Sequence, residues 1–102
     1  MPIPAYQDLF APLLEIAADE QVHSISGVSK ILADQFQLSE QERLELLPSR
    51  KQTVFQNRIS WAKNYFVKAG MLVTQGRGKF RITPLGREFH GKGLEKITLQ
   101  TL

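Results

Sequence analysis

Apolar residues recur at steps of three and four through much of this chain, a spacing typical of amphipathic helices. In residues 5–18 the recurrence places one set of side chains on a single face: Tyr6, Leu9, Phe10, Leu13, Ile16 and Ala17. Pro12 interrupts that segment, because proline removes a backbone donor and crowds the preceding turn. We therefore expect a helix that either begins near Asp8 or bends at Pro12.

Two further helices are predicted from their starts. Residues 22–25 are expected to form a short strand, and Ser26 then caps a helix. The apolar stripe of that helix comprises Val28, Ile31, Leu32 and Phe36. Ser39 and Glu42 have the Ser-x-x-Glu spacing of a capping box. They predict a short third helix that runs through Leu44 and Leu47 and ends before Pro48.

The fourth predicted helix, about residues 53–69, separates its two faces most clearly. Projected at about 100° per residue, one side is apolar: Phe55, Ile59, Ala62, Phe66 and Ala69, widened by Val54, Trp61 and Tyr65. The opposite side carries Gln56, Asn57, Ser60, Lys63 and Asn64, with Thr53 near the same line. Arg58 projects onto the apolar side, where a charge needs carboxylate or carbonyl partners. We expect Arg58 to be a structural tether to an acidic residue of the first half.

The remaining pattern predicts a hairpin and a last helix. Gly70 can end the fourth helix in a left-handed conformation. Residues 71–75 and 79–83 alternate as two strands joined at Gly76-Arg77-Gly78, with Leu72, Phe80 and Ile82 inward and Lys79 and Arg81 outward. Thr83 and Pro84 start a helix as cap and first residue. Leu85 and Phe89 are its expected inward pair.

This order of elements predicts a mostly α fold with a small β-hairpin or a short three-stranded sheet. It is the order of a winged helix (winged helix-turn-helix), whose later helix enters the major groove of DNA. The hairpin, called the wing, lies along the backbone or the minor groove. A chain of 102 residues holds one such domain, which we assign to residues 1–92.

Charge is strongly segregated along the chain. Residues 1–45 contain eight acidic and two basic side chains, whereas residues 46–87 contain nine basic side chains and no acidic one. The net charge of +3 understates this asymmetry. One electropositive face in a small domain favours a polyanion as partner. A basic surface kept for solubility is the alternative, and 42 residues without an acid make it the weaker one.

Several classes of protein are disfavoured by the same composition. The chain has no cysteine, so it has no disulfide or thiolate metal site, which fits the cytoplasm. No apolar run approaches a membrane span, and no secretory signal is present. Catalysis is not expected, because no acid lies between Glu45 and Glu88, and His23 and His90 are more often structural or solvated than catalytic. We expect no metal and no cofactor.

The hypothesis that follows is binding of double-stranded DNA by the fourth helix, its basic lead-in and the hairpin. The predicted DNA-binding residues are Arg50, Lys51, Gln52, Thr53, Gln56, Asn57, Ser60, Lys63, Asn64, Arg77, Lys79 and Arg81. The alternative is a winged helix that binds another protein or forms a homodimer, with Trp61, Phe55 and Tyr65 as an exposed anchor. The helical projection favours these three as core residues.

Four segments resemble the N-terminal domain of the Mrr restriction endonuclease family: Pro2-Ile-Pro-Ala-Tyr6, residues 46–63 (LLPSRKQTVFQNRISWAK), Lys68-Ala-Gly-Met-Leu72 and residues 80–87 (FRITPLGR). The resemblance covers about residues 1–90, and its central block is fairly specific. It implies a winged helix that binds DNA, ahead of a PD-(D/E)xK nuclease domain that cuts foreign, commonly methylated DNA in a longer chain. Residues 93–102 then resemble the start of the linker to that domain. The nuclease carboxylates and lysine are absent here, so no cleavage is expected.

Overall fold

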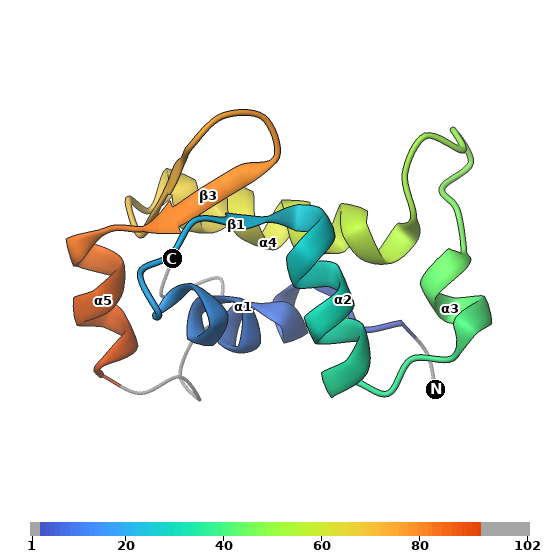
Figure 1. The fold of residues 1–102 in the computed structure, drawn as a ribbon, viewed down its shortest axis with the longest axis horizontal. Helices are drawn as coiled ribbons and strands as arrows, with labels where there is room; N and C mark the ends of the chain where they lie inside the picture. Colours follow the sequence, from blue (N-terminus) through green and yellow to red (C-terminus); the bar gives the residue numbers. More distant parts are fainter. Residues whose placement is uncertain (1–2, 93–102) are drawn as a thin grey trace.

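Helices build most of the fold, and three short strands close one side of it (Figure 1). The computed structural model describes residues 3–92. The elements follow in the order η1 (a 3₁₀ turn, Tyr6–Leu9), α1 (Phe10–Ala17), β1 (His23–Ser24), α2 (Ile25–Gln35), α3 (Glu40–Leu44), α4 (Val54–Lys68), β2 (Leu72–Thr74), β3 (Lys79–Ile82) and α5 (Pro84–His90). Residues 93–102, predicted as a linker, lie outside the described residues.

The first helix accommodates Pro12 by starting late. The 3₁₀ turn η1 leads into α1 at Phe10, so Pro12 is the third residue of the α-helix. The amides of a first helical turn have no partner within the helix, and a proline there costs no hydrogen bond. Of the two expectations for this segment, the late start is the one observed.

The caps of α2 and α3 correct one prediction and confirm another. Ser24, not Ser26, caps α2, and its Oγ accepts a hydrogen bond from the Gly27 amide at 2.9 Å. The segment 22–25 is thus a strand of two residues that leads directly into the helix. The capping box of Ser39 and Glu42 is present as predicted, but α3 ends at Leu44, earlier than expected.

The sheet has the strand order β1-β3-β2, with both pairs antiparallel. Burial alternates along β3, because Phe80 and Ile82 face the core while Lys79 and Arg81 are exposed. Gly76 and Gly78 take positive φ values of 97° and 70° in the connecting loop, a conformation that favours glycine. Three helices packed with this hairpin give a winged helix, as predicted, and we call residues 72–82 the wing.

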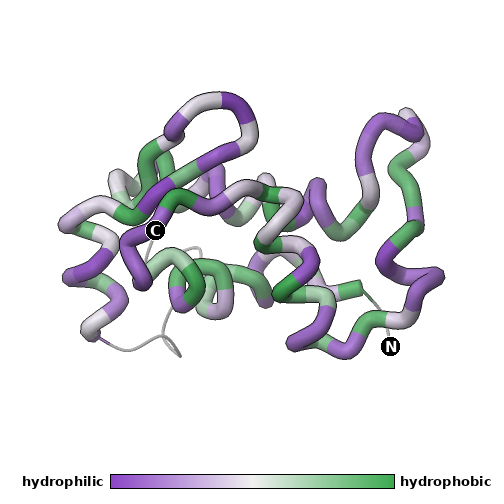
Figure 2. The backbone as a smooth tube through the Cα atoms, viewed as in Figure 1, coloured by the Kyte–Doolittle hydropathy of each residue, from purple (hydrophilic) through white to green (hydrophobic). Residues whose placement is uncertain are grey.

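The core lies between α1, α2, α4 and the inner face of the sheet. Figure 2 shows α1 as largely hydrophobic, in contrast to the mainly hydrophilic loop at the tip of the wing. Phe10 and Phe66 pack edge to face with ring centroids 5.5 Å apart. Phe10, Phe66 and Phe80 are the largest of the fully buried side chains, a set that also includes Leu9, Leu13, Leu14, Val28, Leu32, Ile59 and Leu72.

Three apolar side chains predicted to be inward are instead exposed. Ile31 is 43% exposed, Leu85 50% and Trp61 52%. In α5 the place expected for Leu85 belongs to Gly86, which is buried against Met71 and Ile82. A Cβ at position 86 would lie 2.2 Å from the Met71 carbonyl oxygen, so the close approach of α5 to the sheet depends on this glycine.

Within residues 3–92, no helix is long and apolar enough to cross a membrane.

Candidate nucleic-acid interface

Helix α4 is the longest element and carries the predicted polar face. Thr53 caps it, with its Oγ1 accepting from the Gln56 amide at 3.1 Å. Phe55, Ile59, Ala62 and Phe66 anchor the helix in the core. The bounds and the buried side of α4 are therefore as predicted, and its opposite side is directed away from the core.

The segment before α4 is a short closed loop, residues 45–53, which we call the lead-in loop. Leu46 and Thr53 form an isolated antiparallel bridge, and the Val54 amide donates to the Glu45 carbonyl at 2.8 Å. At its tip the Arg50 amide donates to the Leu47 carbonyl at 2.8 Å, and Arg50 has a φ of 59°. This backbone geometry holds Arg50 and Lys51 exposed ahead of the helix.

The wing and the lead-in loop rise on the same side of the molecule, with α4 running between them in Figure 1. The wing presents three exposed basic side chains, Arg77, Lys79 and Arg81. Because Lys79 and Arg81 alternate with buried Phe80 and Ile82, the strand fixes their outward direction. Basic groups therefore lie at both ends of the polar face of α4.

A small hydrogen-bond network ties the lead-in loop to α4. The Asn57 amide nitrogen donates to Gln52 Oε1 at 3.3 Å, and Gln52 Nε2 donates to Ser60 Oγ at 3.5 Å. These amide and hydroxyl groups are half-buried, whereas Asn64 is exposed one turn further along. The structure thus brings together the polar residues predicted on the first turns of α4.

Among the described residues, none of the six basic side chains predicted to bind DNA forms an ion pair: Arg50, Lys51, Lys63, Arg77, Lys79 and Arg81. Arginines elsewhere do pair, Arg43 with Asp34 at 2.8 Å and Arg87 with Glu20 at 2.7 Å. The acidic half of the chain therefore neutralises other basic groups and leaves this surface positive.

Arg58 is a structural tether, but its partners are not the predicted acid. Its Nη1 donates to the carbonyl oxygens of Ile3 at 2.7 Å and Pro4 at 3.1 Å. Glu42 and Glu45 line the same cavity, but the atoms that accept from Arg58 are these two carbonyl oxygens. Carbonyl groups satisfy the guanidinium because the extended start of the chain passes alongside α4.

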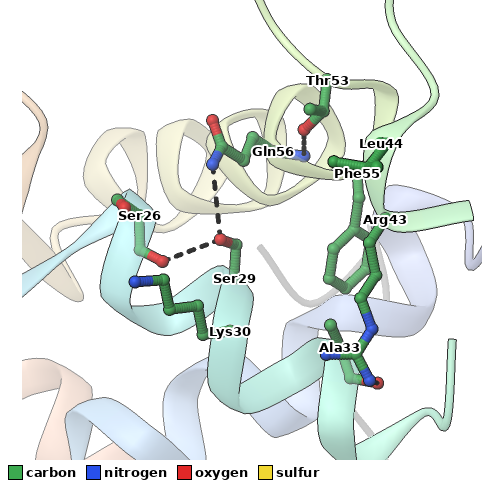
Figure 3. A pocket seen from close by; sticks show the side chains of 9 residues that line it. All are labelled: Ser26, Ser29, Lys30, Ala33, Arg43, Leu44, Thr53, Phe55 and Gln56. Atoms are coloured by element: carbon green, nitrogen blue, oxygen red, sulfur yellow. Dashed lines mark hydrogen bonds between the residues drawn. The ribbon is translucent and has the colours of Figure 1, made fainter. Parts of the chain in front are cut away.

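Sequence reasoning missed a contribution from α2. Ser26, Ser29 and Lys30 line a cavity of about 300 Å³ together with Thr53 and Gln56 of the predicted interface (Figure 3). Gln56 Nε2 reaches Ser29 Oγ at 3.5 Å, and Ser29 Oγ donates to the Ser26 carbonyl at 2.8 Å. The spacing of Ser26, Ser29 and Lys30 on one side of a helix was the available signal.

A catalytic or metal site would need converging histidine or carboxylate side chains. Among residues 3–92, no group of three or more histidine, cysteine or carboxylate residues could hold a metal ion. The histidines lie with single carboxylates, His23 2.9 Å from Asp19 and His90 2.9 Å from Glu15. The pKa of Asp19 is below its ordinary value, chiefly because the Gln21 amide donates to it and then because of His23. Both histidine–carboxylate pairs lie at the protein surface, since Asp19 and Glu15 are exposed.

Comparison with known proteins identifies relatives of the chain. The Mrr N-terminal domain family matches residues 6–92. A relative from Escherichia coli (strain K12), the type IV methyl-directed restriction enzyme EcoKMrr, is 28% identical over 101 residues. The match covers 98% of this chain and 33% of the relative, so the chain spans about a third of that protein's length. No solved structure matches the chain.

Proposed function

Because this chain belongs to the Mrr N-terminal domain family, we propose that it binds double-stranded DNA as the recognition module of a restriction system. In this proposal α4 enters the major groove, and the lead-in loop and the wing hold the flanking phosphates. The chain itself carries out no cleavage.

One observation carries the proposal: six exposed or half-exposed basic side chains at α4, the lead-in loop and the wing have no carboxylate partner among the described residues. Cationic groups left unpaired on one surface are the electrostatic footprint of a polyanion site. Phosphate contacts of this kind supply affinity and register rather than sequence preference.

Base contacts are assigned to the polar side of α4. Asparagine and glutamine can bond to the Hoogsteen edge of adenine, and lysine to guanine. Gln56, Asn57, Ser60, Lys63 and Asn64 are therefore the proposed base-reading residues. Gln52 and Thr53 orient the start of the helix, through hydrogen bonds to Ser60 and Asn57 and to the Gln56 amide.

The relative suggests the wider setting. Its name describes a methyl-directed restriction enzyme, and two thirds of its length lie outside the match. We propose that this domain acts with a nuclease domain, that methylated DNA is its substrate and that it works in the cytoplasm, where that DNA is accessible.

A second candidate function is a protein interface, and one observation favours it. Trp61 is 52% exposed and lines one surface cavity with Tyr6 and Tyr65, whose stacked rings have centroids 5.4 Å apart. Large aromatic side chains are frequent anchors of protein interfaces. In this alternative the module forms a homodimer or docks on another protein through that flank of α4, without binding DNA.

A titration of labelled duplex DNA distinguishes the two functions. Lys63→Glu and the double variant Arg77→Glu/Lys79→Glu are expected to weaken binding at least tenfold, because each reverses charge on the proposed surface. Lys92→Glu is the charge-matched control, since Lys92 lies beyond α5 beside Glu88. Unchanged binding in both test variants, with folding verified by circular dichroism, would reject this surface. No duplex binding by the wild type, together with a homodimer that is lost on Trp61→Ala, would favour the aromatic flank.

A further inference from the structure

The cavity between α2, α3 and α4 has the form of a small binding site beside the proposed DNA surface. Its floor is apolar and buried, with Ala33 3% and Phe55 2% exposed. Leu44 of α3 forms an apolar wall and is 63% exposed at the mouth. A volume of about 300 Å³ is at the lower end of the range for small-molecule sites.

The polar groups around this cavity suit a nucleic acid rather than an apolar peptide. No carboxylate lines the cavity, and Lys30 at its edge has no ion-pair partner among the described residues. Gln56, Ser29 and Ser26 form a chain of hydrogen bonds along one side, visible in Figure 3. The amide of Gln56 and the exposed hydroxyl of Ser26 can donate to or accept from the edge of a base, while buried Ser29 positions the amide.

Arg43 contributes to the wall without being available for a ligand. Its Nε donates to the Leu38 carbonyl at 3.0 Å and its Nη1 to Asp34 at 2.8 Å. It therefore fixes α3 against α2 and keeps Leu44 over the cavity. Lys30, the other lining cation, pairs with no carboxylate of residues 3–92 and can meet a phosphate.

The position of the cavity decides which part of DNA it would meet. Thr53 and Gln56 belong both to its lining and to the first turn of α4, the end proposed to enter the major groove. The C5 position of cytosine and the N6 position of adenine both lie at the major-groove edge. A methyl group at either position projects toward a protein helix in that groove.

We propose that this cavity binds the methyl-bearing edge of a modified base, so that the first turns of α2 and α4 with Leu44 determine preference for methylated DNA. The inference rests on the proposed DNA binding and deepens it. Ala33, Leu44 and Phe55 supply apolar contact for the methyl group, Gln56 bonds to the base edge, and Lys30 meets the adjacent phosphate. 5-Methylcytosine and N6-methyladenine both present a methyl group next to polar atoms of the base at the major-groove edge, so the same contacts apply to either base.

The test compares affinities of one protein for matched duplexes. Short duplexes with a randomised core are synthesised with unmodified bases, with 5-methylcytosine or with N6-methyladenine. The wild type is expected to bind one methylated set about tenfold more tightly, the discrimination that one methyl group in an apolar pocket can give. The set that gains affinity identifies the base.

Two variants at the exposed mouth probe the cavity without disturbing the core. Ser26→Leu narrows the entrance and Leu44→Gln removes the apolar wall, and both positions are solvent-exposed. Each is expected to bring the affinity ratio of methylated to unmethylated duplex toward one. A variant that only weakens folding or phosphate contacts changes the affinities for methylated and unmethylated duplex by the same factor, so their ratio is kept. Lys92→Gln is the control variant, and it should also keep this ratio.

The results separate this inference from the function on which it rests. Salt-dependent duplex binding with no effect of methylation would overturn the inference and leave DNA binding intact. A methylation preference unchanged in both mouth variants would also overturn it, because the methyl group would then be read elsewhere. No binding to any duplex would overturn the proposed function and this inference together.

Discussion

The guanidinium of Arg58 donates to the Ile3 carbonyl oxygen at 2.7 Å, which joins positions 55 residues apart. The same Nη1 also donates to Pro4. This contact holds the extended start of the chain against α4, beside the stacked rings of Tyr6 and Tyr65. The arginine lies in the acid-free half of the sequence, yet its observed role is to fix the position of the helix.

Replacement of Arg58 by methionine is expected to lower stability. Methionine keeps an apolar stem but removes both hydrogen bonds, and bonds to charged donors contribute about 1.5–3 kcal/mol each when intact. Since this site is only part-buried, we expect a loss of about 1–2 kcal/mol, or roughly 4–16 °C in Tm. Lys68→Met, an exposed change on the same helix, should shift Tm far less. A stable Arg58→Met protein that fails to bind DNA would contradict the structural role.

Gly86→Ala is expected to destabilise the domain, because the added Cβ would meet the Met71 carbonyl oxygen at 2.2 Å and Ile82 Cγ1 at 2.7 Å. Overpacking against backbone costs about 1–3 kcal/mol. Gly91→Ala is the control at the C-cap of the same helix, where φ is −67° and the added Cβ would lie 3.5 Å from the Glu88 carbonyl oxygen. Urea unfolding should show a loss for the first variant and none for the second. Equal stabilities would contradict the close packing of α5 on the sheet.

The capping box predicts a pH-dependent contribution from Glu42. The pKa of this carboxylate is below its ordinary value, chiefly because the Ser39 amide donates to it at 2.7 Å. A lowered folded pKa means that the contribution is fully present above the unfolded value, near 4.3, and is lost as pH falls through the folded value. The Tm difference between wild type and Glu42→Gln should therefore shrink as pH falls below about 4. A difference that grows in acid would reverse the assigned sign.

Helix and strand positions followed largely from the sequence because local spacing determines them. The buried face of α4 and the alternation along β3 are set by periods of 3.6 and two residues. Thr53 and Ser39 cap helices through residues only three positions away. The prediction of Ser26 as the cap of α2 is wrong. Two serines precede the apolar stripe, and the pairing of His23 and Ser24 with β3 makes Ser24 the cap.

The misplaced residues are those whose burial depends on distant contacts. A helical projection gives the direction in which Trp61 points, but it does not show whether another segment packs over that side chain. In the structure Tyr6 stacks on Tyr65, and Trp61 stays 52% exposed. Gly86 has no side chain, so its burial leaves no apolar position in the sequence pattern. Arg58 is a structural tether as predicted, but its carbonyl partners leave no signature in the sequence.

The candidate interface likewise has one part that local spacing predicts and one part that it does not. Local periodicity predicts the polar face of α4 and the basic wing. The part contributed by α2 and Leu44 depends on the position of α3, which Arg43 links to α2 through contacts with residues nine and ten positions away. Tertiary packing therefore creates the cavity beside Gln56, and no spacing rule along the chain reveals it.

The salt dependence of duplex affinity should reveal the phosphate contact of each basic side chain separately. For a duplex site, the slope of log affinity against log salt is about −0.9 per phosphate neutralised. Arg77→Gln is expected to reduce the magnitude of that slope by about 0.9 and to weaken binding similarly across sequences. Arg77 in the wing loop forms no ion pair with any residue that the structure describes, whereas Lys92 lies 4.0 Å from Glu88, so Lys92→Gln should leave the slope unchanged. Equal slopes for all three proteins would remove Arg77 from the interface.

Arg50→Gly should separate stability from binding, because its two effects have opposite signs. Arg50 has a φ of 59° at the tip of the lead-in loop, a left-handed conformation that costs a side-chain-bearing residue about 1 kcal/mol and glycine almost nothing. The variant is expected to be as stable as the wild type or slightly more stable. Its affinity for duplex DNA should nevertheless fall, with a shallower salt slope, since the proposed phosphate contact is lost. Arg50→Asn, which tolerates the same backbone, should bind as weakly as the glycine variant. Binding equal to wild type in both would show that the loop geometry serves a purpose other than holding this arginine toward DNA.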